Sequence, residues 1–490
     1  MATESNDLGS NGVNGQSSAS NALSGSKGPE RVVVSRPISG RVHFALLTLV
    51  VLLAIGAWTL GRNRLEHRAV ESALTRAAVV AREEHRVRDL DIEFYRMRAA
   101  NDPISADDRS HLAQLYLARG RASGDPEDAR RSEAEARGAL AIRSGHNSSA
   151  LLLLTSALLE QHRFAEALEA AATLVAREPD DESHRALLAE VYLELGRYDE
   201  ARATFATITA SRRALTVAPR LARLAEIEGR NDAARAMLKA ARDEAVQRPG
   251  IPREQIAWFH LRLADSEMRA GRFRSARESL DAALAVHPDD HRVLAALATL
   301  ATLREDWKAS AEFGERAMAI VPDPTTLGLV ADAHNALGDS SQAKEFQAAV
   351  EMTALGTPGP LHRAWSLFLL DHGRRITEVH ERIEQELRTR RDVYGYDALA
   401  WSYHVQGRNA EAQRAMRSAL AQGTRDALMF YHAGMIELAL GNTIAGRVQL
   451  EQALVLNPHF HPMHAARARD ALKNTRSGCG GRNAAGCRSS

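Results

Sequence analysis

The sequence predicts an all-α solenoid of helix-turn-helix repeats, preceded by one apolar helix long enough to cross a membrane. Three observations predict this fold. Short loops carry a glycine, with a small residue five positions later, and this pattern returns at a period close to 34 residues. Apolar residues recur with helical spacing on both sides of these loops, and residues 42–61 carry no formal charge. A unit of this length cannot bury its apolar positions alone, so neighbouring units must bury them. The loop pairs are Gly196–Ala201, Gly229–Ala234, Gly271–Ala276, Gly338–Ala343, Gly407–Ala412 and Gly441–Gly446.

The amino-terminal segments differ from the repeats in composition. Residues 1–40 are rich in Ser, Gly and Asn and have few large apolar side chains, so we expect a disordered tail. Residues 42–61 are VHFALLTLVVLLAIGAWTLG, and a helix of this length spans roughly 30 Å, the hydrocarbon thickness of a bilayer. We therefore predict a transmembrane helix. A cleaved signal peptide is the alternative, but the polar leader is longer than signal peptides usually have.

The orientation of this helix does not follow from its flanking charges. Four Lys or Arg residues lie close to it on each side, so the positive-inside rule gives no direction. Moving a 40-residue tail outward is the less usual route, so we expect a single-pass protein with its solenoid on the extracytoplasmic side. Residues 62–100 continue as a charged helix, predicted to be a solvated stalk. Its acidic residues offset its arginines, so no nucleic-acid partner is expected.

Each repeat is predicted to contain two antiparallel helices. In residues 183–208 an apolar stripe precedes Gly196-Arg197 and another follows it, both with helical spacing. A tight turn between two such stripes is typical of a helical hairpin. The stripes are Leu187, Leu188, Val191 and Tyr192 before the turn, and Tyr198, Ala201, Phe205 and Ile208 after it.

The repeats resemble the tetratricopeptide (TPR) family, whose pattern has Leu-Gly/Ala at positions 7–8, Ala at 20 and Pro at 32. Leu297, Ala298 and Pro322 fit one unit, and Gly434 and Pro458 fit another. The resemblance implies a right-handed superhelix of about nine units over residues 148–460. Unit starts are expected near 148, 182, 215, 257, 291, 324, 359, 393 and 427.

Three segments depart from the regular pattern. The unit near 359 has Glu378 where the small residue belongs and Trp365 at position 7, so we expect a repacked junction. Residues 104–145 are predicted to form a degenerate TPR-like repeat, and residues 461–474 a cap helix that closes the last apolar face. Residues 475–490 are predicted to be a disordered tail, whose Cys479 and Cys487 could pair or stay free.

Composition and motifs argue against catalysis. The 490 residues carry a net charge of +1, which gives no electrostatic case for a polyanion partner. Arginine far exceeds lysine, a sign of GC-rich, bacterial-type coding. The sequence lacks a Gly-rich phosphate loop, a nucleophile elbow and the His-Glu-x-x-His metal motif. Because repeats, cap and anchor occupy the chain, we expect neither an enzyme nor a cofactor.

The TPR resemblance implies a concave groove lined by positions 2, 5, 9, 12 and 13 of each first helix. Mapped here, the groove is polar in early units and aromatic in late ones, and exposed Trp, Tyr and Arg commonly carry binding energy. The alternative is that some of these rings fill the junction between the units at 359 and 393. No unit has the Lys-5 and Asn-9 pair of TPR domains that bind acidic carboxyl termini. The expected partner-binding residues are Trp258, Arg363, Tyr394, Asp397, Trp401, His404, Tyr431 and Met435.

The predicted function is a membrane-tethered scaffold or adaptor that binds a protein or peptide partner, as an assembly or regulatory factor. The alternative is a metal-handling accessory protein that uses the carboxyl-terminal His/Met/Cys cluster, since imidazole and thiolate suit zinc and copper. This cluster contains His459, His461, Met463 and His464, with Cys479 and Cys487 downstream. These histidines could equally be exposed residues of the turn before the cap helix. Family analogy adds a third possibility, a regulatory subunit of an envelope polysaccharide or lipid pathway.

Overall fold

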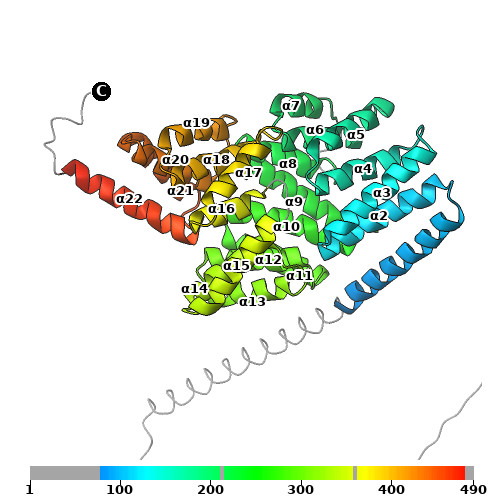
Figure 1. The fold of residues 1–490 in the computed structure, drawn as a ribbon, viewed down its shortest axis with the longest axis horizontal. Coiled ribbons are helices and arrows are strands. Elements are labelled where there is room, and N and C mark those ends of the chain that lie inside the picture. Colours follow the sequence, from blue (N-terminus) through cyan, green and yellow to red (C-terminus); the bar gives the residue numbers. More distant parts are fainter. Residues whose placement is uncertain (1–77, 210–214, 357–360, 481–490) are drawn as a thin grey trace, which may run out of the picture. The chain divides into compact units, whose positions relative to one another are not determined.

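The structure is a computed structural model that describes residues 78–209, 215–356 and 361–480, without the side chains of 476–480. All regular secondary structure in these ranges is helical (Figure 1). The predicted tail 1–40 and the predicted transmembrane helix 42–61 lie outside the described residues, as do the stalk up to residue 77 and the chain from 481. Among the described helices, none is long and apolar enough to cross a membrane.

The described residues form consecutive helical hairpins, as the sequence predicts. Helix starts at 148, 182, 291, 324, 393 and 427 coincide with predicted unit starts. The first helices are α2 (Ala106–Ser123), α4 (Ser148–Glu160), α6 (Glu182–Glu194), α8 (Ala218–Ile227), α10 (Arg253–Arg269), α12 (His291–Leu303), α14 (Pro324–Ala336), α16 (Arg363–Asp371), α18 (Val393–Val405) and α20 (Ala427–Ala439).

Each first helix is followed by a second one that packs antiparallel to it. The second helices are α3 (Pro126–Ile142), α5 (Phe164–Arg177), α7 (Tyr198–Ala206), α9 (Asn231–Gln247), α11 (Phe273–Val286), α13 (Trp307–Met318), α15 (Ser340–Gly356), α17 (Ile376–Glu386), α19 (Asn409–Leu420) and α21 (Thr443–Leu456). The predicted cap helix is α22 (Pro462–Gly480), which continues beyond the expected end at 474.

Local sequence explains where the helices begin and why the pairs pack closely. Aspartate recurs at the N-cap of first helices, where its carboxylate accepts hydrogen bonds from backbone N–H groups of the first turn. Ala298 of α12 is 0% exposed, which shows that the small residue permits close helix contact. The capping aspartates are Asp181, Asp290, Asp323, Asp392 and Asp426.

The unit near 359 is irregular, as its sequence indicates. Its first helix, α16, has only 9 residues, and Arg375 before α17 has a left-handed φ of 48°. Glu378 pairs with Arg382 at 3.2 Å, while the neighbouring Val379 is 0% exposed and fills the inner position. The Trp365 indole N–H donates to the Thr325 hydroxyl of the preceding unit at 3.0 Å. The packing has therefore shifted by one residue relative to the repeat pattern.

Distant units touch through their loops, a feature that the repeat pattern does not contain. The loops that end α6, α8 and α10 pack against the loops that begin α18, α20 and α22, and three hydrogen bonds mark these inter-turn contacts. Arg391 N donates to Leu195 O at 3.2 Å. Thr424 Oγ1 donates to Ile227 O at 2.6 Å, and Asn457 Nδ2 donates to Met268 O at 3.1 Å. A hydrophobic cluster that includes Leu193, Tyr198, Ile227, Val393 and Met429 lies beneath them.

Helix 78–101 (blue in Figure 1) lies beside α2 and does not stand apart from the repeats, unlike a solvated stalk. Its Ile92, 6% exposed, packs with Leu112 and Tyr116 of α2. Its Arg98 pairs with Asp108 of α2 at 2.9 Å. The helical structure predicted for residues 78–100 is present, but one side of this helix is buried.

Candidate functional site

Of the eight predicted partner-binding residues, three are buried and five are partly exposed. Asp397, Trp401 and Tyr431 are 0%, 4% and 1% exposed, so a partner cannot touch them in this conformation. Trp258 lies apart, packed on Phe259 with ring centroids 5.0 Å apart. The remaining four are partly exposed: Arg363, Tyr394, His404 and Met435. Whether any of the eight contacts a partner stays a prediction.

Asp397 is the centre of a buried ionic network between three first helices. Its carboxylate accepts from Arg363 Nε of α16 at 3.1 Å and lies 2.8 Å from His432 Nδ1 of α20. Burial alone would raise the pKa of Asp397, but His432 and Arg363 outweigh it and lower the pKa to about 2. The ionised carboxylate therefore ties α16, α18 and α20 together.

Trp401 and Tyr431 belong to the packed interior of the late units. The Trp401 indole N–H donates to Asp371 Oδ1 at 2.8 Å, and its ring stacks on His432 with centroids 4.1 Å apart. Tyr431 stacks on His464 at 4.5 Å. These two rings therefore fill the interior between the late units. This agrees with the alternative stated above, in which some of the late aromatic rings pack inside and do not line the groove.

One accessible part of the inner face is an arginine–tyrosine surface further towards the middle units. Arg223 of α8 and Arg363 of α16 lie over the Tyr394 ring, with guanidinium carbons 4.7 and 5.3 Å from its centroid. Arg262 and Asp265 of α10 extend this surface as an ion pair at 3.5 Å. We name Arg223, Arg363 and Tyr394 the Arg–Tyr surface.

Sequence reasoning overlooked Arg223, although a signal was present. It occupies position 9 of the unit near 215, one of the positions that the TPR resemblance assigns to the groove. Among the described residues, no carboxylate lies within 4 Å of the Arg223 guanidinium as an ion pair, whereas Arg363 is held by Asp397. Arg223 therefore has hydrogen-bonding capacity for an added carboxylate or carbonyl group.

A possible metal-ligand group lies at the late end of the inner face. Asp371, His461 and His464 offer ligand atoms that all lie within 4.8 Å of one another. His464 Nε2 lies 2.9 Å from Asp371 Oδ2, and its buried Nδ1 has no hydrogen-bond partner among the described residues. His459 is not part of this group, because its ring lies beside Phe273 with centroids 6.0 Å apart. The sequence therefore placed two of the three histidines correctly near one another but did not connect them with Asp371.

Burial controls the protonation of this group. It lowers the pKa of His461 to about 3, helped by the nearby His464. For Asp371, burial would raise the pKa, but the hydrogen bond from His464 and the neighbouring histidines outweigh it and lower the pKa. A neutral imidazole beside an ionised carboxylate is the protonation state that binds zinc or copper.

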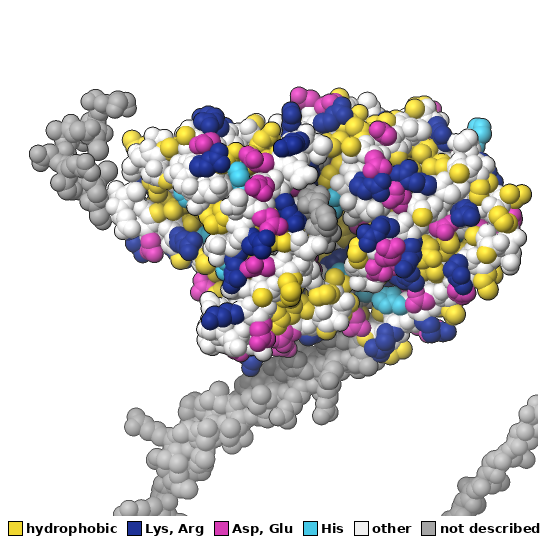
Figure 2. All heavy atoms as spheres, viewed as in Figure 1, with side chains coloured by type: hydrophobic (Ala, Val, Ile, Leu, Met, Phe, Trp, Pro, Cys, Tyr) yellow, Lys and Arg dark blue, Asp and Glu magenta, His cyan; other side chains and the backbone are white. Residues whose placement is uncertain are grey.

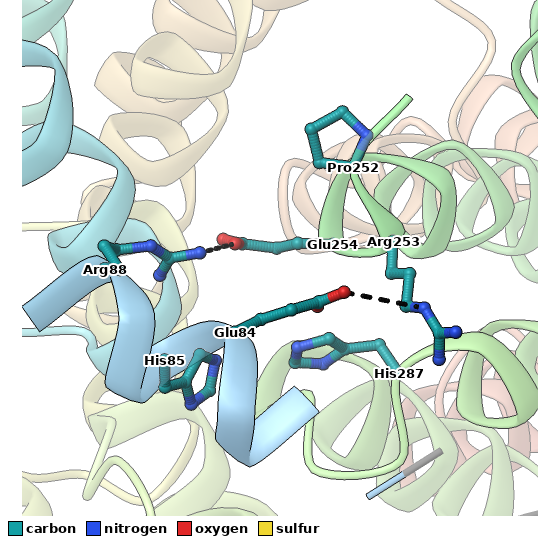
Figure 3. Close-up of a pocket in the computed structure, with 7 residues that line it drawn as sticks. All are labelled: Glu84, His85, Arg88, Pro252, Arg253, Glu254 and His287. Carbon is teal, nitrogen blue, oxygen red and sulfur yellow. Dashed lines mark hydrogen bonds and ion pairs between the residues drawn. The ribbon is translucent and has the colours of Figure 1, made fainter. Parts of the chain in front are cut away.

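A cavity of about 160 Å³ separates helix 78–101 from α10 and the loop after α11 (Figure 3). Ion pairs cross it from Arg88 to Glu254 at 3.0 Å and from Arg253 to Glu84 at 3.6 Å. These two ion pairs therefore connect helix 78–101 to the repeats across the cavity. Figure 2 shows Lys, Arg, Asp and Glu interspersed over the visible face, without a large patch of one sign.

Comparisons with known proteins support the repeat assignment. Two tetratricopeptide repeat family models match residues 158–224 and 261–323, so the chain contains TPR repeats. No curated protein matches the sequence.

Several solved structures are similar at low identity. Yeast Tom70 is 11% identical, with 83% of this chain and 97% of that one covered and a TM-score of 0.34. A tetratricopeptide repeat protein from Parabacteroides merdae is 17% identical over 50% of this chain and 92% of that one, with a TM-score of 0.32. The type IV pilus biogenesis factor PilW is 18% identical, with the same coverages and a TM-score of 0.30. At such scores the likeness carries no information about this chain's function.

Proposed function

We propose that the chain is a membrane-tethered scaffold or adaptor, an assembly or regulatory factor whose TPR repeats bind a protein or peptide partner. The Arg–Tyr surface carries the proposal, because it combines a partly exposed aromatic ring, Tyr394, with the Arg223 guanidinium, which makes no ion pair within the described part of the chain. Arg and Tyr are enriched among residues that dominate binding energy at protein interfaces. The partner group that suits Arg223 is a carboxylate or a backbone carbonyl.

Tethering rests on the sequence of residues 42–61 and their uniform apolarity. We propose that the repeats lie on the extracytoplasmic side. Protease treatment of intact and permeabilised cells tests on which side of the membrane the repeats lie. Cleavage of the repeats while the inner membrane is still intact supports the extracytoplasmic side. Cleavage only after the inner membrane is breached places the repeats inside.

Partner capture by crosslinking from membranes tests the binding surface. Arg223→Ala and Tyr394→Ala should each reduce capture, since losing an interface anchor typically costs at least about 2 kcal/mol, roughly thirtyfold in affinity. Arg277→Ala is the matched control, because Arg277 also lies over an aromatic ring, Phe313 at 5.8 Å, but belongs to a second helix. Capture that survives Arg223→Ala and Tyr394→Ala contradicts the proposal.

Trp401→Ala is not an equivalent test of binding. Removing a buried Trp typically costs about 3–5 kcal/mol of stability, so loss of capture would follow from unfolding of the late units. A circular-dichroism melt of each variant separates the two causes. Arg223→Ala should melt close to the wild type, because this guanidinium makes no ion pair within the described residues, whereas Tyr394→Ala also removes a ring that packs on a hydrophobic cluster.

A second candidate function is metal binding by Asp371, His461 and His464, which the geometry of this group favours. Zinc competition with a chromogenic chelator tests it on the purified full chain. His461→Asn should lower zinc affinity at least about tenfold, whereas His459→Asn should leave it unchanged, because His459 lies outside the group. Equal affinity of wild type and His461→Asn rejects this function.

A further inference from the structure

The candidate metal group Asp371, His461 and His464 also connects the two ends of the late inner face. Asp371 is the last residue of α16, whereas His464 lies in the first turn of α22. His464 Nε2 lies 2.9 Å from Asp371 Oδ2, although 93 residues separate the two along the chain. The pair therefore reaches past α18 and α20, the first helices of the two units between α16 and α22. We name Asp371, His461 and His464 the late bridge.

The late bridge lies against the two buried aromatic rings of the inner face. The His464 ring stacks on Tyr431 with centroids 4.5 Å apart and meets Trp401 edge-on at 5.7 Å. Asp371 Oδ1 accepts the Trp401 indole N–H at 2.8 Å. Because both rings pack directly against residues of the late bridge, separating α16 from α22 would uncover part of each ring.

Apolar burial holds the start of α22 only weakly. Within residues 462–475 the buried apolar side chains are Ala465 and Ala468, which are 2% and 0% exposed, while Met463 and Leu472 stay partly exposed. A methyl group removes little apolar area from water, and hydrophobic stabilisation scales with that area. A segment with few buried apolar contacts opens at a lower free energy than the core of a protein. The closed position of α22 therefore depends on the polar contacts of the late bridge.

One nitrogen of His464 has no partner, which suits the exchange of a proton for a metal ion. The side chain is 0% exposed, and its Nδ1 has no hydrogen-bond partner within the described part of the chain. A carboxylate only accepts hydrogen bonds, so Nε2 carries the proton that is shared with Asp371. When Nε2 binds an ion instead, this proton can move to Nδ1, and the imidazole stays neutral. His461 supplies a further ligand, because the three residues have ligand atoms within 4.8 Å of one another.

We propose that a divalent transition-metal ion such as zinc binds the late bridge and holds α22 over Trp401 and Tyr431, and that loss of the ion uncovers both rings for a partner. The proposal rests on the metal binding given above as the second candidate function and adds its consequence for the inner face. Imidazole and carboxylate groups are common zinc ligands. The ligands come from α16 and from the start of α22, so an ion bound by all three stabilises the closed arrangement over any in which they separate.

Residue-resolved oxidation by hydroxyl radicals tests whether the ion controls access to the rings. The purified full chain is oxidised with excess zinc and, in parallel, with a chelator. Trp401 and Tyr431 should oxidise at least about fivefold faster without zinc, because release of the ion lets the covered rings meet solvent. Trp258 is the internal control, since it packs on Phe259 of α10 and should oxidise equally in both samples.

Hydrogen exchange tests the position of α22. Backbone amides of residues 462–472 should exchange at least about tenfold more slowly with zinc, whereas those of α13 should not change. His461→Asn should abolish both zinc effects, because it removes one ligand. His459→Asn is the matched control and should keep them, since His459 lies beside Phe273 outside the late bridge. Circular dichroism of both variants checks that their helical content equals that of the wild type.

Zinc competition with a chromogenic chelator on the same samples separates failure of this proposal from failure of metal binding. Wild-type chain that binds zinc without any change in Trp401 oxidation or α22 exchange overturns the proposal and leaves the metal-binding function standing. Wild-type chain that does not bind zinc overturns both. A zinc effect that persists in His461→Asn places the ion elsewhere and also overturns the proposal.

Discussion

The turns of the middle units and those of the late units share one sequence motif and differ in what surrounds them. Most of these turns have a glycine in the left-handed conformation, with φ of 71° at Gly229 and 76° at Gly407. A Cβ at Gly229 would overlap the carbonyl oxygen of Gly423, whereas one at Gly407 would meet no atom of the described residues within 4 Å. Gly196 resembles Gly229, a Cβ at Gly271 would approach the Asn457 side chain at 3.1 Å, and Gly338 and Gly441 resemble Gly407.

This difference separates a local requirement from a tertiary one. A positive φ favours glycine in every turn, because other L-residues adopt this conformation at a cost. Only in the middle units does the absence of a side chain at this glycine also leave room for a loop of a later unit. The repeat motif is therefore the same in both regions, but the middle turns carry the inter-turn contacts.

The largest expected effect is that of Gly229→Ala compared with Gly407→Ala. Both substitutions place a Cβ in a left-handed residue, which costs about 1–2 kcal/mol. Gly229→Ala must also displace the loop at Gly423, and overpacking typically adds about 1–3 kcal/mol. Thermal unfolding followed by circular dichroism should show the larger loss for Gly229→Ala. Equal melting of the two variants would show that the loops do not pack closely in solution.

Thr424→Val should give an intermediate loss, localised at one inter-turn contact. Thr424 is 3% exposed, and its removal leaves the Ile227 carbonyl without its hydroxyl donor at a cost of about 1–3 kcal/mol. Thr443→Val is the control, because its hydroxyl bonds its own turn at 3.5 Å and the change should stay within about 0.5 kcal/mol. Hydrogen exchange should increase around residues 227 and 424 together; an increase at 424 alone contradicts coupling between the two loops.

The smallest expected effect is a gain from Glu305→Gly. Glu305 occupies the turn position with a φ of 58°, where most units have glycine. Relief of the left-handed strain should exceed the entropy that glycine adds to the unfolded chain, and stability should rise by about 0.5–1 kcal/mol. Glu305→Ala keeps the Cβ and separates the effect of charge from that of conformation. A gain for Ala equal to that for Gly would assign the effect to charge.

Much of the fold could be predicted because it is local. Asp290 before α12 and Asp392 before α18 cap helices that begin at the expected residues. The unit predicted near 257 begins earlier, at Arg253, because Pro252 starts the helix as its N-cap. Of the candidate site, the sequence indicated the residues of the inner face through their repeat positions. The sequence could not distinguish accessible Tyr394 from buried Tyr431, since both are tyrosines on the first helix of a unit.

The sequence by itself determined the repeat, most of the unit starts, the turn glycines and the irregularity of the unit near 359, because each depends on residues within about one unit. Only the tertiary structure decided which inner side chains are buried and which remain accessible. Leu195 meets Arg391, and Ile227 meets Thr424, through small rotations that accumulate over the intervening units. No single repeat motif determines this total rotation. The burial of Asp397 and Trp401 and the accessibility of Tyr394 therefore follow from the packing of the array as a whole.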